Sequence, residues 1–234
     1  MSHDLATVLL QLRLQAFASS EVLATATGVS RSGIEELLVR AESDRLVQHR
    51  DGRVVGWTLT AAGRAHGQDL LTAELDAVGG RSALLEAYTE FLPLNAELLS
   101  ICTDWQTVVV NGEHIANDHT DARRDAAVLA RLEPLHTAAL SVTTRFAGAL
   151  DRFSRYGPRL EEAHRHVTAG RPEWLTRATG GSYHGVWFEL HEHLLATLGR
   201  SREAELTPRY TPTTVGGTSE VPATAGHPEN GEIP

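Results

Sequence analysis

The segment from Gly28 to Arg64 limits the possible folds of this chain more than any other. Apolar residues in its first half recur every three or four positions, which is the spacing of one helix face: Ile34, Leu37, Leu38 and Ala41. Ser30 and Ser32 precede them and can cap the first helical turn, and Ser32 with Glu35 fits a capping box. The pattern therefore predicts a helix that begins near Ser30.

The second half of the same segment has strand character. The helical spacing ends after Leu46, residues 54–59 are rich in β-branched and aromatic side chains, and Asp51-Gly52 between 46–50 and 54–59 is a two-residue hairpin signal. Thr60 then stands where it can cap a helix over residues 61–78. A helix that runs into a tight hairpin is the outline of a winged helix-turn-helix, in which the hairpin is the wing.

The flanking residues resemble a known family. Residues 20–27 predict a short helix that Gly28 ends at a turn, and the run Gly-Val-Ser-Arg-Ser over 28–32 leads into the next helix as in bacterial winged-helix regulators. The run Leu-Thr-Ala-Ala-Gly-Arg over 59–64 resembles the strand-to-helix step that ends the wing in the MarR family of transcriptional regulators. The resemblance covers residues 5–75, about a third of the chain. It implies binding to double-stranded DNA and, because the helix after the wing helps to build the subunit interface in MarR-like dimers, a homodimer.

The predicted helix and wing supply candidate DNA contacts, which are Ser30, Arg31, Ser32, Glu35, Arg50 and Arg53. Arg31 can pair bidentately with guanine, Ser32 can hold a phosphate, and the two wing arginines can reach the backbone or the minor groove. Glu35 and Glu36 depart from this picture, because a carboxylate near DNA is tolerated only where it accepts from cytosine or points aside. An ordinary solvated helix face is the alternative interpretation.

The charge of the whole chain does not favour nucleic acid, since the formal net charge is −9. The predicted winged domain nevertheless concentrates basic side chains: Arg31, Arg40, Arg45, His49, Arg50, Arg53 and Arg64. Lysine is absent, so arginine supplies every fixed positive side chain. A local basic surface therefore remains compatible with the acidic total.

The sequence shows neither a secretory signal nor an apolar run approaching the roughly 18 residues that span a bilayer. We therefore expect a soluble cytoplasmic protein without a membrane partner. Cys102 is the only cysteine, which excludes an intramolecular disulfide and favours a small core residue over a nucleophile.

From Ser82 onward helical spacing dominates and no strand is predicted. We expect a mainly α protein with three parts: a winged helix-turn-helix domain with its following helix over 1–79, an all-α helical bundle over 80–206, and a disordered tail over 207–234 rich in Pro, Thr and Gly. Within the bundle, Pro93 starts or kinks a helix that continues to about Val110, a polar loop follows Asn111-Gly112, and Gly157-Pro158 ends a long helix.

Aromatic and polar residues of the helical part could line a small-molecule pocket: Trp105, Asp118, His119, Tyr183, His184, Trp187 and His191. His184 and His191 are seven residues apart and so share a helix face. The alternative is a packed helix interface with hydrogen-bonded imidazoles. The segments 91–95, 102–106 and 182–195 also resemble an actinobacterial helical region, found in some relatives beside phosphoenolpyruvate-utilising modules, to which no activity is attached.

The chain holds 12 histidines, and two Glu-x-x-His pairs have the spacing used by di-iron carboxylate bundles, Glu161 with His164 and Glu133 with His136. Pro134 places Glu133 at the helix entrance and weakens the second pair. Solvent-facing histidines explain these residues more simply, so neither a metal nor another cofactor is expected. Sequence motifs for zinc proteases, serine hydrolases, phosphate-binding loops and dinucleotide binding are absent.

The first hypothesis is a dimeric DNA-binding transcriptional regulator whose helical domain supplies dimer contacts or a pocket for a small-molecule effector. In the second, the helical domain is an enzyme or an enzyme accessory protein and the winged helix is a docking module. In the third, the chain is an interaction adaptor without a ligand. Catalytic residues are predicted by none of the motifs.

Overall fold

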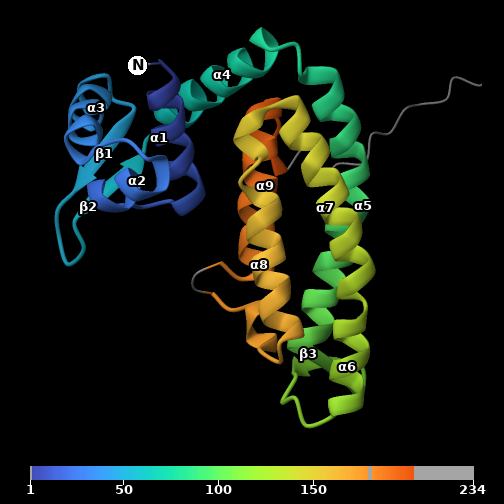
Figure 1. Ribbon diagram of the computed structural model, residues 1–234. Coiled ribbons are helices and arrows are strands. Elements are labelled where there is room, and N and C mark those ends of the chain that lie inside the picture. The colour runs from blue at the N-terminus through green and yellow to red at the C-terminus, as the bar shows by residue number, and fades with distance from the viewer. Residues whose placement is uncertain (1, 179–180, 203–234) are drawn as a thin grey trace, which may run out of the picture.

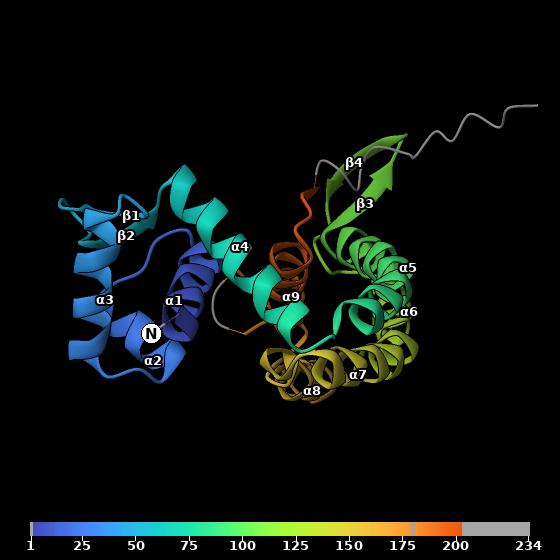
Figure 2. The same ribbon diagram turned by 90° about the horizontal axis from the view of Figure 1, so that it is seen from above.

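The computed structural model describes residues 2–178 and 181–202, which are mainly helical with two short antiparallel hairpins (Figures 1 and 2). The N-terminal elements are α1 (Ser2–Gln15), α2 (Ser20–Thr27), α3 (Arg31–Ser43), β1 (Val47–Arg50), β2 (Gly56–Leu59) and α4 (Ala61–Ala77). The predicted disordered tail over 207–234 lies outside the described residues.

Helix α3 begins where the sequence pattern predicts, and only one of the two candidate caps is used. Ser30 is the N-cap, and its Oγ accepts a hydrogen bond from the backbone N–H of Gly33 at 3.2 Å. Ser32 lies inside the helix, so the predicted capping box of Ser32 with Glu35 is wrong. Glu35 instead accepts a hydrogen bond from Arg31. The expected apolar face is confirmed, because Ile34, Leu38 and Ala41 are buried in the N-terminal core.

The first hairpin has a longer loop than predicted. Val47 pairs with Leu59 and Arg50 with Gly56, so residues 51–55 form the loop in place of a two-residue turn at Asp51-Gly52. A two-residue turn at Asp51-Gly52 would shift the pairing of β1 with β2 and separate Leu59 from Val47. The observed pairing keeps these two residues together in the N-terminal core. Trp57 also exchanges two backbone hydrogen bonds with Ala18, at 2.8 and 3.1 Å, which fixes the observed register.

The junction between β2 and α4 depends on Thr60 and Gly63. As predicted, Thr60 caps α4, and its Oγ1 accepts from the Gly63 N–H at 2.9 Å while donating to the Arg45 carbonyl at 2.7 Å. A Cβ on Gly63 would lie 1.8 Å from the carbonyl oxygen of Leu46. The absence of a side chain therefore lets α4 start directly against the chain that leads into β1.

The C-terminal elements are α5 (Arg81–Gln106), β3 (Thr107–Val110), β4 (Glu113–Ala116), α6 (Ala122–Ala130), α7 (Leu132–Ala149), the 3₁₀ turn η1 (Asp151–Phe153), α8 (Tyr156–Thr168), the 3₁₀ turn η2 (Pro172–Trp174) and α9 (Tyr183–Leu198). Helices α5 and α7 lie side by side, and α8 and α9 pack beside them (Figure 1). Phe91, Phe146, Phe153 and Trp187 are among the aromatic residues of their common core. Cys102 is buried in this core, which confirms its structural role, and burial raises the pKa of its thiol to about 12.

Two expectations for the helical part are corrected, and of the two alternatives at Pro93 the start of a new helix is excluded. Residues 107–116 form a hairpin, whereas the sequence pattern predicted helix to Val110 and then a loop. Asn111 and Gly112 have φ of 53° and 85°, the positive values of a tight hairpin turn, and the valines before them are β-branched strand formers. Pro93 lies inside the single helix α5, and Gly157-Pro158 lies in the first turn of α8, where proline is tolerated.

Helix α4 runs between the two groups of helices, with α1–α3 and the first hairpin on one side and α5–α9 on the other (Figures 1 and 2). Helix α9 packs against both α1 and α4. Ala6, Leu10, Leu71 and Ala196 form a small apolar cluster at this junction. Within the part of the chain that the structure describes, no helix is both long enough and apolar enough to cross a lipid bilayer.

Candidate functional site

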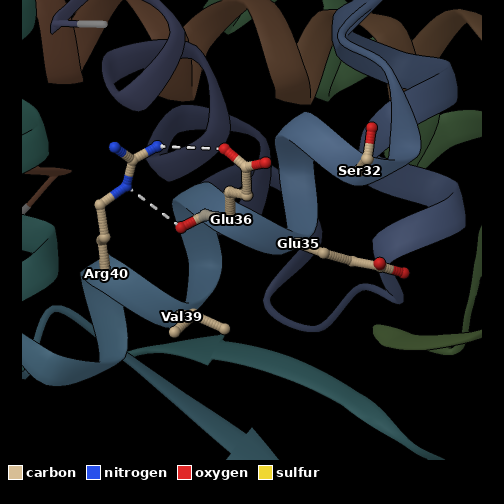
Figure 3. A pocket seen from close by; sticks show the side chains of 5 residues that line it. All are labelled: Ser32, Glu35, Glu36, Val39 and Arg40. Atoms are coloured by element: carbon tan, nitrogen blue, oxygen red, sulfur yellow. Dashed lines mark hydrogen bonds and ion pairs between the residues drawn. The ribbon is translucent and has the colours of Figure 1, made fainter.

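The solvent face of α3 is open over its first three turns. Ser32, Glu35, Glu36, Val39 and Arg40 line a shallow hollow on this face (Figure 3). The side chain of Val39 is 61% exposed, and it contributes an apolar surface to this face. The hollow therefore combines one apolar side chain with polar groups of both signs.

Two ion pairs neutralise much of the charge on this face. The Nε of Arg31 donates to Glu35 Oε1 at 3.0 Å, and a guanidinium nitrogen of Arg40 lies 3.9 Å from Glu36 Oε2 (Figure 3 shows the second pair). Arg40 also donates from Nε to the Glu36 carbonyl at 3.2 Å. All four side chains are at least half exposed, and exposed pairs at this spacing contribute only about 0.3–0.5 kcal/mol. The arginines can therefore change partner at little cost.

The loop of the first hairpin extends from the same side of the molecule. Arg50 and Arg53 are exposed, and Val54 and Val55 are 65% and 55% exposed. In both views α3 and this loop lie on the side away from α5–α9 (Figures 1 and 2). Of the predicted contact residues, the structure thus groups Ser30, Arg31, Ser32 and Glu35 at the start of α3, and Arg50 and Arg53 at the hairpin. Arg40 was not in that predicted set, although its spacing from Glu36 places it on the same face.

The predicted pocket residues from the 105–119 region form a local cluster. The rings of Trp105 and His119 pack in a tilted arrangement with centroids 4.3 Å apart, and His119 Nδ1 lies 2.9 Å from Asp125 Oδ2. Asp118 accepts hydrogen bonds from the backbone N–H and the hydroxyl of Thr120, which lower the pKa of its carboxyl. These contacts hold the loop between β4 and α6.

The predicted pocket residues of α9 are mostly core residues. Tyr183, Trp187 and His191 are at most 3% exposed, and His184 is half-buried. Trp187 stacks on Phe91 at 4.8 Å and donates from Nε1 to Asn95 Oδ1 at 3.0 Å. This packing favours the alternative of a helix interface for these three residues.

The two Glu-x-x-His pairs do not converge in the manner of a di-iron bundle. His136 stacks on His164 at 3.9 Å, and its Nδ1 lies 3.2 Å from the Tyr183 hydroxyl. His164 pairs with Glu133 across the two helices, at 3.1 Å. Among the described residues, no three His, Cys, Asp or Glu side chains are grouped so that they could hold a metal ion.

Neither family models, nor curated proteins, nor solved structures match this chain.

Proposed function

We propose that residues 2–77 are a winged helix-turn-helix that binds double-stranded DNA, and that the chain is a transcriptional regulator. The observation that carries the proposal is the combination of an open α3 face with an exposed, arginine-bearing hairpin on the same side of the molecule. In this proposal α3 is the recognition helix, and the loop 51–55 is the wing.

The dimensions of these elements support the proposal. Helix α3 has 13 residues and is therefore about 20 Å long, and the major groove is about 12 Å wide and admits one helix. Ser30, Arg31 and Ser32 stand at its N-terminal end, the part of a recognition helix that contacts base edges in helix-turn-helix proteins. Arg50 and Arg53 would then reach phosphates or the minor groove.

Glu35 and Glu36 on α3 would have to release their arginines before these could bind DNA. DNA phosphates would compete with Glu35 for Arg31, and with Glu36 for Arg40, and each competition replaces a weak exposed pair. The two glutamates then contribute to specificity, because a carboxylate is accepted opposite the amino group of cytosine and repelled elsewhere.

We further propose that two copies bind a pseudo-palindromic site. One recognition helix reads only a short half-site, and helix-turn-helix dimers place two such helices about 34 Å apart on one face of the duplex. The helical part, residues 81–198, would supply the dimer contacts. Light scattering at the concentration used for DNA binding tests this part, because a monomer bound to a single half-site would contradict it.

Selection of bound fragments from a fragmented genome, followed by fluorescence polarisation on the enriched duplex, tests DNA binding. Arg31→Ala and Arg53→Ala should each weaken binding by about 1–3 kcal/mol if the arginine contacts a base, and less if it contacts only phosphate. Arg165→Ala is the matched control, since Arg165 is an exposed, paired arginine on α8. No enrichment, or equal affinity in all four proteins, would contradict the proposal.

A further inference from the structure

A second hollow lies where the N-terminal elements meet the helical part. It has a volume of about 230 Å³ and is bounded by α1 and the end of α2 on one side, and by η1, the start of α8 and α9 on the other. This volume is well above the roughly 10–15 Å³ that one water needs, so the hollow can hold several waters or one small organic molecule. Its lining is rich in polar side chains, which distinguishes it from the apolar junction around Leu71.

Two buried side chains at this cavity have polar atoms without a hydrogen-bond partner. Gln11 on α1 is 2% exposed and its Nε2 is unpartnered, and His193 on α9 is 1% exposed and its Nε2 is unpartnered. A buried donor without an acceptor costs about 1–3 kcal/mol. Neither atom has a hydrogen-bond partner among the described residues.

The contact of His193 Nδ1 with the Tyr156 hydroxyl indicates which ring nitrogen of His193 carries the proton. Burial, and after it the charge of Arg155, hold the pKa of His193 well below its usual range, so the ring is neutral. The Tyr156 hydroxyl lies 3.1 Å from His193 Nδ1 and 3.5 Å from the Glu189 carbonyl. Donation along the shorter contact leaves the ring proton on Nε2. His193 and Gln11, which both line the cavity, then each carry an N–H group without an acceptor among the described residues.

Two arginines add positive charge. Arg152 is committed to Glu74 at 2.6 Å and to the Thr7 hydroxyl at 2.6 Å. Arg155 is held more loosely, because its carboxylate partner Glu189 is 3.8 Å away and its guanidinium lies 5.4 Å from the Tyr156 ring centroid. Arg155 can therefore turn donors toward the cavity. Asp4 also lines the cavity and is the only carboxylate of its lining.

We propose that this cavity binds a small molecule with a compact oxyanion group, a carboxylate or a phosphate, through Arg155, Gln11 Nε2 and His193 Nε2. The anion would satisfy both unpartnered donors and would contact α1 and α9 together. Its binding would stabilise the contact between the two groups of helices, and it does not require the proposed DNA binding.

Thermal unfolding of the full chain, in a buffer free of other oxyanions, tests the proposal with inorganic phosphate and malonate as separate probes. Sodium chloride at equal ionic strength is the control for screening. At a hundredfold excess over the dissociation constant, a bound probe should raise the unfolding midpoint by about 5–10 °C. Saturation with only one probe would support the site and identify the anion class.

Cavity variants locate the effect. Arg155→Gln and Gln11→Leu should each lower the affinity for the probe that binds saturably by at least about tenfold, as expected for loss of one charge-assisted or buried hydrogen bond. Gln11→Leu should unfold no earlier than the wild type without probe, because it removes an unpartnered amide, and Arg165→Gln should leave probe binding unchanged. A midpoint that neither probe raises beyond chloride, or a shift that survives in both cavity variants, would mean that the cavity holds only water.

Discussion

Buried histidines of the helical part give a prediction at the scale of single residues. Burial, and next to it the charge of His164, lower the pKa of His136 to about 4, and burial, followed by the charge of Arg202, lowers that of His191 to about 4. In the unfolded chain these imidazoles titrate near 6.5. The unfolded state therefore binds more protons between these values, and stability is full above pH 6.5 and falls as the pH decreases toward 4.

Each such histidine contributes a slope of up to about 1.4 kcal/mol per pH unit in this interval. Urea unfolding at a series of pH values measures the slope. His136→Gln should reduce it while retaining a partner for the Tyr183 hydroxyl, and His114→Gln, at an exposed position of β4, is the matched control. A His136→Gln slope equal to that of the wild type between pH 4 and 6.5 would contradict the assignment.

At the scale of elements, the step from β2 to α4 depends on close approach at Gly63. Gly63→Ala would place a methyl group against the Leu46 carbonyl, where no neighbouring side chain can give way. We expect a loss of about 2–4 kcal/mol, in the range of severe overpacking. Gly148→Ala on α7 is the matched control, since nothing lies within 4 Å of its added Cβ, and it should be neutral or stabilising by up to about 1 kcal/mol. Equal unfolding midpoints for the two variants would contradict this account of the junction.

Local patterns in the sequence anticipated most of the elements, and they failed where partners distant in the chain decide the outcome. The face of α3 and the Thr60 cap follow from spacing alone. The register of the first hairpin does not, because Ala18 fixes it from outside the hairpin. In the second hairpin, Val108–Val110 continue an apolar run that helix spacing also fits, and the positive φ values at Asn111 and Gly112 decide against helix.

The surface of α3 and the cavity between α1 and α9 also differ in how far the sequence alone could predict them. Residues at the start of α3 could be proposed as a site from the sequence, because the helix, turn and hairpin pattern on which that proposal depends is local. The hollow lined by Gln11 and His193 could not be predicted, because these residues are separated by most of the chain and come to one hollow only through the packing of α9 on α1. Their sequence neighbourhoods show a polar residue on an apolar helix, which is also the pattern of an ordinary core position.

At the scale of the whole molecule, the carboxylate of Glu192 lies close to arginines from three segments of the chain. Glu192 on α9 accepts from Arg13 Nε on α1 at 2.7 Å and lies 3.4 Å from Arg202 and 3.8 Å from Arg64 on α4. Burial acts to raise the pKa of Glu192, but the hydrogen bond from Arg13 and the charges outweigh it, and the pKa is lowered. The pair of Arg13 and Glu192 is largely buried, with side chains 9% and 14% exposed.

Glu192→Gln removes the charge that these arginines share. We expect a loss of about 1–3 kcal/mol, below the value for a fully buried pair because the cluster is partly solvated, and hence a midpoint about 3–10 °C lower. Glu162→Gln, which breaks an exposed pair with Arg165, should leave the midpoint unchanged. If both variants have the same unfolding midpoint as the wild type, Glu192 does not hold the two groups of helices together.

The salt dependence of DNA affinity tests the central proposal most directly. If α3 and the hairpin loop bind the duplex, the logarithm of the affinity should fall linearly with the logarithm of the salt concentration, and loss of a phosphate contact in Arg53→Ala should reduce that slope by about 1. The Arg165→Ala control should keep the slope of the wild type. Affinity that does not change with salt, or one slope shared by all three proteins, would contradict a DNA-binding role for this surface.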